Sequence, residues 1–310
     1  MKSLKMSLFF TWAVCSMAMA QNTFDHLIDQ EKDLLSRINQ TSIRSTDKYA
    51  PSSCKRKYKD LFSKRKVRIL LALGYGDSGS DTVLDYLSHS AFKRKLTEPC
   101  GADNYSCGFR VSKREPDLLI KSESDPTGEN NHLIEIKLIR GAYTYSDSKN
   151  VSKEVIETQK AFCEATTIKF FTEIASGTDV IIYSGHSRNG GGPDFCPPNR
   201  KADHHVNYSW YEKNRPGMQT MLSSMKMAVN AGNPNKVIAM LSCSSQKHFY
   251  KDLMKVNPKA GYLLTKRLAT FAEVTRDAYA TLDSLLSQRC EDGFNMSFDE
   301  RGATSWKNMF

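Results

Sequence analysis

Short apolar runs rich in β-branched residues recur along this chain, each bounded by glycine, aspartate or serine. The clearest cover residues 67–73, 179–185 and 236–242. Runs of this length and composition are typical of strands buried on both faces of a parallel sheet. The second run leads into His186 and the third into Cys243. Reactive side chains therefore follow two predicted strands.

Helical spacing separates these runs. We predict helices over 81–88, 152–177, 246–256 and 270–288, the last opened by a Thr270–Glu273 capping box. In the 152–177 helix, the apolar face is expected to hold Ala161, Ala165, Ile168, Phe171 and Ala175. Further strands are expected at 117–121, 133–139 and 261–264, with a turn at 126–128 between the first two. This alternation predicts an α/β fold, a mainly parallel sheet flanked by helices.

The chain divides by composition into segments. Residues 1–20 have the basic start, short apolar stretch and Ala18-Met19-Ala20 ending of a secretion signal. Residues 21–66 are predicted to form a helical extension packed on the outside. An α/β domain over 67–290 follows, with a β-rich hairpin insertion at 100–150, and 291–310 form a tail. No later stretch has membrane length, so we expect export to the periplasm or the extracellular space.

Cysteine content agrees with export. Of eight cysteines, Cys15 leaves with the signal, and the odd number that remains leaves at least one thiol unpaired. Cys100 and Cys107 are close enough for a local disulfide, and Cys243 is the natural unpaired candidate. The formal charge of +10 at pH 7 is concentrated in the basic run at 55–68. We interpret that run as a solvated helix face, without firm evidence for a nucleic-acid partner.

His186 and Cys243 together suggest nucleophilic catalysis. In open α/β sheets, chemistry lies just beyond the carboxyl ends of the strands. An imidazole beside a thiol withdraws its proton and later protonates the leaving group. Backbone amides around Gly185, Ser187 and Cys243 are candidates to stabilise an oxyanion.

These two blocks, IIYSGHSRNG and VIAMLSCSS, resemble the caspase-like cysteine peptidases. In that family an apolar strand ends in His-Gly and a later apolar strand ends in a short residue and Cys. The resemblance implies a caspase-like three-layer fold, peptide-bond hydrolysis of a peptide or protein substrate, and no cofactor. This chain departs from the pattern at Ser187, where the family has Gly, and at Ser242, where Ala is usual.

Neighbouring residues have other candidate roles. Arg188, Asp194 and Ser244 are expected to contact substrate or to hold the loops. The sequence from Gly185 to Asn189 approaches the serine-hydrolase elbow, but that motif needs Gly at its fifth position and a helix at the serine. Asp203, His204 and His205 lack the spacing of a strong metal site, and we assign no metal ligands.

Two alternative functions stay open. Asp117, Glu135 and Lys137 resemble the PD-(D/E)xK signature of metal-dependent nucleases, in which carboxylates on adjacent strands hold Mg²⁺. The same sequence pattern also arises from paired surface charges on a half-exposed strand, without any metal site. A non-catalytic envelope protein of the same fold, binding a partner through its Gly-rich loop, is the second alternative. The oligomeric state is not indicated by the sequence.

Overall fold

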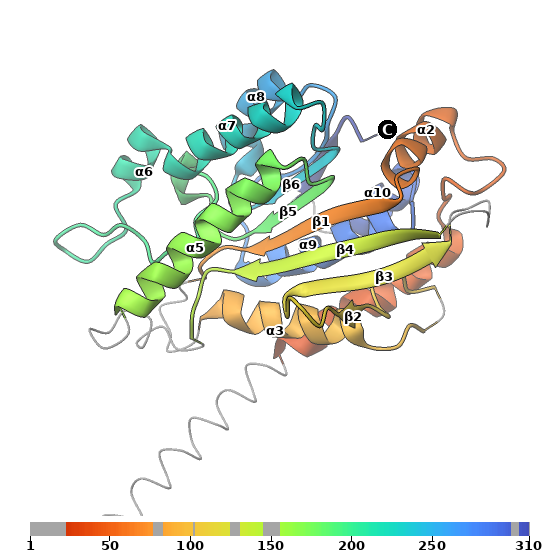
Figure 1. Ribbon diagram of the computed structural model, residues 1–310, viewed down its shortest axis with the longest axis horizontal. Coiled ribbons are helices and arrows are strands. Elements are labelled where there is room, and N and C mark those ends of the chain that lie inside the picture. Colours follow the sequence, from red (N-terminus) through yellow and green to blue (C-terminus); the bar gives the residue numbers. More distant parts are fainter. Residues whose placement is uncertain are drawn as a thin grey trace, which may run out of the picture.

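One mixed sheet organises the protein. The computed structural model describes residues 23–76, 83–101, 103–124, 131–144, 156–298 and 304–309, and the predicted secretion signal and the 126–128 turn lie outside them. Within these residues the sheet has eight strands in the order β2-β3-β4-β1-β5-β6-β7-β8 (Figure 1). The strands are β1 (Lys66–Leu73), β2 (Arg110–Val111), β3 (Leu118–Ser124), β4 (Asn131–Arg140), β5 (Val180–Ser184), β6 (Val237–Leu241), β7 (Gly261–Thr265) and β8 (Thr304–Lys307).

The centre of the sheet is parallel, as predicted. Strands β4, β1, β5, β6 and β7 run in one direction, whereas β2 and β3 at one edge and β8 at the other pair antiparallel. Every residue of β5, β6 and β7 is buried. Burial on both faces explains why these strands read as continuous apolar runs.

Helices cover both faces of the sheet, giving three layers (Figure 1). The helices are 23–41, α2 (Ser52–Phe62), α3 (Leu84–Thr97), α5 (Ile156–Ala175), α6 (Tyr208–Asn214), α7 (Pro216–Asn230), α8 (Ser245–Val256), α9 (Phe271–Leu286) and α10 (Glu291–Phe298). Residues such as Leu70 and Ala72 pack with α5, α7 and α8, while their neighbours Ile69 and Leu71 pack with α3 and α9. The predicted capping box of Thr270 and Glu273 opens α9.

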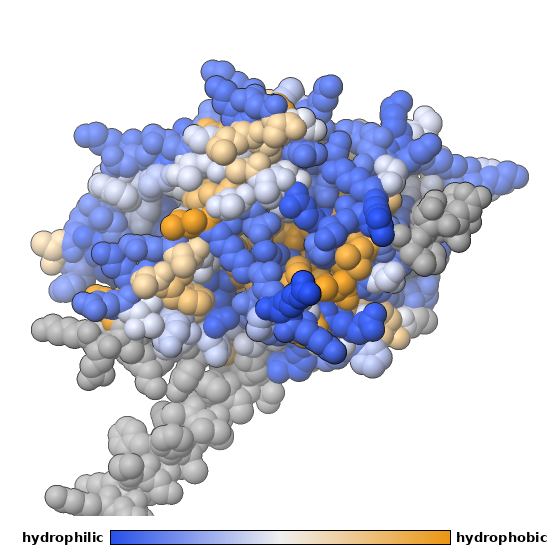
Figure 2. All heavy atoms as spheres, in the orientation of Figure 1, coloured by the Kyte–Doolittle hydropathy of each residue, from blue (hydrophilic) through white to orange (hydrophobic). Residues whose placement is uncertain are grey.

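The surface drawn in Figure 2 is mostly hydrophilic, with hydrophobic atoms in several separate groups. No helix in the described part of the chain is both long enough and apolar enough to cross a bilayer.

The N-terminal segment is helical, as predicted, but it does not pack on the outside. Ile28, Leu35 and Ile38 are buried in the same hydrophobic cluster as α9. A disulfide between Cys54 on α2 and Cys290 ties the segment to the end of the chain. The two ends of the described chain therefore close one core.

Three further expectations need correction. In α5 the buried face holds Gln159, Cys163, Thr166, Phe170, Phe171 and Ile174, whereas Ile168 is 67% exposed and Ala161 is exposed. Polar and disulfide-bonded residues occupy part of the buried face of this helix. The face predicted from apolar spacing alone was therefore wrong. The expected β-hairpin within 100–150 is present as β3 and β4, but it belongs to the main sheet, because β4 pairs directly with β1. The expected tail contributes α10 and the edge strand β8.

A buried ion pair at the end of α9 is hydrogen-bonded to the N-terminal helix. The Arg289 guanidinium and the Asp283 carboxylate are fully buried and 2.6 Å apart (Nη2 to Oδ2). Arg289 Nε also donates to Asn39 Oδ1 at 2.7 Å, and its Nη1 donates to Ser284 Oγ at 2.7 Å. Hydrogen bonds to several partners compensate for the desolvation of both charges.

Removing one partner of this pair should destabilise the fold strongly. We expect Arg289→Met to lower the free energy of unfolding by about 3–5 kcal/mol, because the Asp283 charge would stay buried without its partner. The exposed Asp33–Arg37 pair provides the control, and Arg37→Met should change stability by less than about 1 kcal/mol. Urea unfolding followed by circular dichroism measures both. Equal effects of the two variants would contradict the assigned role of Arg289.

Candidate functional site

The hydrogen-bonded register of β5 and β6 aligns the two predicted reactive residues. Ser184 at the end of β5 pairs with Leu241 at the end of β6, 57 positions later, and the same interval separates His186 from Cys243. Gly185 N continues the pairing by donating to Leu241 O at 3.1 Å. Neighbouring strands lie about 5 Å apart. The imidazole and the thiol therefore leave adjacent strands at the same level.

Both residues border one pocket of about 390 Å³. This volume falls within the range of about 300–1,000 Å³ of small-molecule sites. The pocket lining includes no aspartate or glutamate; its members are His186, Ser187, Arg188, Asn189, Tyr208, Cys243, Ser244, His248 and Leu268. Leu268 and Tyr208, which are 74% and 52% exposed, give the pocket an apolar rim.

Cys243 is the free cysteine of the described chain. The others pair as Cys54–Cys290, Cys100–Cys107 and Cys163–Cys196. This confirms the local Cys100–Cys107 loop and the unpaired thiol at position 243. Cys243 is half-buried, and its Sγ donates to Ala269 O at 3.4 Å. Attack on a substrate therefore requires the thiol to leave that carbonyl and turn toward an imidazole.

The loop after His186 is held by an ion pair. Arg188 Nε lies 3.1 Å from Asp194 Oδ2, and the Arg188 side chain is only 2% exposed. Tyr211 also donates to Asp194 Oδ2, at 3.1 Å. Arg188 and Asn189 both adopt the left-handed conformation, so a regular helix does not start at Ser187. Asp194 therefore holds the loop in place. Arg188 is its ion-pair partner and also borders the pocket.

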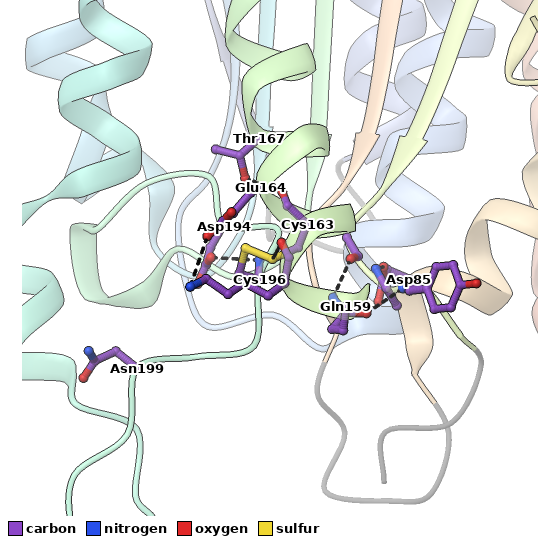
Figure 3. Close-up of a disulfide and its surroundings, with 12 residues drawn as sticks. Asp85, Gln159, Cys163, Glu164, Thr167, Asp194, Cys196 and Asn199 are labelled. Carbon is purple, nitrogen blue, oxygen red and sulfur yellow. Dashed lines mark hydrogen bonds and ion pairs between the residues drawn. A yellow bond between two sulfur atoms is a disulfide. The ribbon is translucent and has the colours of Figure 1, made fainter. Parts of the chain in front are cut away.

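A disulfide fixes the same loop from the other side. Cys163 on α5 bonds to Cys196, and Cys196 N donates to Asp194 Oδ1 at 3.2 Å. Figure 3 shows Asp194 directly beside this disulfide. The bond thus anchors to α5 the carboxylate that positions Arg188.

Two backbone amides remain available to an oxyanion. Within the described residues, neither the Ser187 amide nor the Cys243 amide donates a hydrogen bond. The Gly185 amide is engaged with Leu241 O, so Gly185 cannot serve as predicted. Ser244 N donates to Arg267 O at 2.9 Å, which makes Ser244 a loop-holding residue. Unengaged amides of residues that border the same pocket as the thiol suit oxyanion stabilisation.

A second imidazole, which sequence analysis did not identify, borders the pocket. His248 lies in the first turns of α8, five residues after Cys243, and its Nδ1 lies 3.2 Å from where a Cβ on Gly190 would be. Burial, then the nearby charges of Lys247 and Arg215, lower the pKa of His248. Its position five residues after Cys243, at the start of a predicted helix, was the signal available in the sequence.

Of the nuclease candidates, Glu135 and Lys137 line one pocket, whereas Asp117 lies apart from them. Asp117 Oδ1 lies 3.3 Å from His89 Nε2 on α3, whereas Lys137 Nζ lies 2.6 Å from Glu173 Oε1 on α5, which covers the other face. Glu135 pairs with Lys66 at 2.8 Å. A shared metal ion cannot be held from opposite faces of a sheet. The described residues contain no group of three metal-binding side chains, and Asp203, His204 and His205 are exposed.

Comparison with known proteins adds no further assignment. No family model, curated protein or solved structure matches the chain.

A buried carboxyl lies at the same edge of the sheet. Asp85 is completely buried, its Oδ1 accepts from Gly76 N at 2.9 Å, and its Oδ2 accepts from Ala142 N at 2.7 Å. It thereby ties the segments that follow β1 and β4. Burial raises the pKa of Asp85 to about 6, against the opposing effect of these hydrogen bonds.

Because the pKa of Asp85 is raised on folding, its contribution to stability is complete below pH 3.8 and is lost as the pH rises through about 6. The loss should reach about 3 kcal/mol by pH 8. We expect Asp85→Asn to remove this fall, so that the free energy of unfolding of the wild type drops relative to the variant between pH 4 and pH 8. Urea unfolding across this range measures it, with the exposed Asp60→Asn as control. Parallel pH profiles for wild type and Asp85→Asn would contradict the assignment.

Proposed function

We propose that this chain is an exported cysteine peptidase of caspase-like fold, which hydrolyses peptide bonds with Cys243 as nucleophile and His186 as general base and acid. The observation that carries the proposal is the level alignment of the two residues beyond β5 and β6, around one pocket. A second observation supports it: Cys243 is a free thiol, whereas the other six described cysteines form disulfides. Disulfides are also compatible with an oxidising compartment outside the cytosol.

The chemistry follows from the available groups. His186 takes the proton from Cys243 Sγ, and the thiolate attacks the carbonyl carbon of the substrate peptide bond. The Ser187 and Cys243 amides stabilise the resulting oxyanion. His186 then gives its proton to the leaving amine, which departs and leaves an acyl-enzyme. Water, deprotonated by His186, attacks this thioester, and the carboxylic acid and the thiol are released.

The borders of the pocket favour an uncharged substrate side chain near the cleaved bond. No carboxylate lines the pocket, and the one guanidinium, on Arg188, is already paired with Asp194. Leu268 and Tyr208 offer exposed apolar surface at the rim. A basic side chain would find no counter-charge in this pocket.

Substitution of Cys243 tests the proposal. On a broad peptide library analysed by mass spectrometry, Cys243→Ala should abolish every cleavage made by the wild type, because no other described thiol is free. His186→Ala should lower kcat/KM by about 10²–10⁴-fold.

His248→Gln is the matched control, since it removes the other imidazole of the pocket and should retain most of the activity. Chelators should have no effect. Cleavage that persists in Cys243→Ala, or that disappears with a chelator, would refute the cysteine mechanism. A larger loss in His248→Gln than in His186→Ala would reassign the base.

A further inference from the structure

A second pocket lies at the opposite end of the sheet from the candidate active site. It has a volume of about 660 Å³ and is bordered by α2, by the amino ends of β6 and β7, and by the last described residues of the chain. In Figure 1 the arrowheads of β1 and β4 point left, whereas α2 and the C-terminal mark lie together on the right. The two pockets have no lining residue in common.

The rim of this pocket is cationic. Arg56 and Lys57 come from α2, Lys236 precedes β6 and Lys259 precedes β7. None of the four forms an ion pair with any residue of the described chain, although the carboxylate of Asp60 also borders the pocket. Unpaired cations that converge on a concavity attract a ligand with more than one negative charge. Part of the basic run predicted from the sequence therefore borders this pocket.

The walls below the rim are apolar. Pro234, Met254 and Pro258 present partly exposed apolar side chains to the pocket, and the buried side chains of Leu61, Leu285 and Met309 also line it. A ligand that carries only charge would leave these walls in contact with water. A ligand with an apolar body would cover them and gain from their burial.

We propose that this pocket binds a phosphate monoester with an apolar body. The phosphate dianion would lie among Arg56, Lys57, Lys236 and Lys259, where an arginine fork and ammonium groups can donate to its oxygens. The apolar body would lie against Met254 and Pro258, which are not fully buried. This site is independent of the proposed peptidase activity.

Isothermal titration with three probes tests the proposal on the full chain at pH 8 and low salt. Octyl phosphate, kept below its micelle-forming concentration, has both parts; inorganic phosphate has only the charge, and octyl glucoside has only the chain. We expect octyl phosphate to bind at one site at least about tenfold more tightly than either of the others, with weaker binding at high salt. Equal binding of octyl glucoside, or of inorganic phosphate, would overturn the proposal.

Paired variants test the location. Lys236→Gln with Lys259→Gln should weaken octyl phosphate binding about tenfold, since two of the four cations are lost. Lys213→Gln with Lys226→Gln removes the same charge from exposed positions that do not line the pocket, and should leave the affinity unchanged. Equal losses in both pairs would show non-specific attraction and overturn the site. Cys243→Ala should bind as the wild type does, so failure here is distinguishable from failure of the peptidase proposal.

Discussion

The hydrogen-bonded pairing of β5 with β6 is the constraint on which the candidate site depends. Parallel strands in register end at the same edge of a sheet, so residues at equal distances past those ends are neighbours. Ser184 pairs with Leu241 in that register. His186 lies two positions after Ser184, and Cys243 lies two positions after Leu241. A slip of one residue would turn the buried side chains to the opposite face and disrupt the packing on both faces of the sheet.

The surrounding structure limits what this edge can do. Three disulfides consume every other described cysteine, which leaves one thiol beside the pocket. The Arg188–Asp194 pair, braced by the Cys163–Cys196 bond, fixes the loop whose Ser187 amide is unengaged. A preorganised amide and a fixed loop are what a covalent mechanism needs, because rearrangement during the reaction would raise its barrier. Under the proposed mechanism, the thiol, which donates to Ala269 O, must leave that carbonyl.

Much of this arrangement was predictable, because central strands that are buried on both faces appear in the sequence as continuous apolar runs. The strands before His186 and Cys243 and the cap of α9 followed from local pattern alone. The buried face of α5 did not, because Gln159 and Cys163 are buried for a hydrogen bond and a disulfide, which hydrophobic spacing cannot express. Other features depend on tertiary contacts between distant elements and could not be predicted from local pattern. These are the hydrogen bond of the Gly185 amide, the approach of His248 to Gly190 and the separation of Asp117 from Lys137.

The central claim is that Cys243 is a nucleophile activated within this pocket. Its most direct test is mass-spectrometric mapping of the native, non-reduced protein after treatment with peptidyl acyloxymethyl ketones, which react with activated thiols. The account predicts one adduct, at Cys243, that forms in the wild type and is lost in His186→Ala and after unfolding. A rate of Cys243 labelling that is unchanged by unfolding or by the loss of His186 would contradict it.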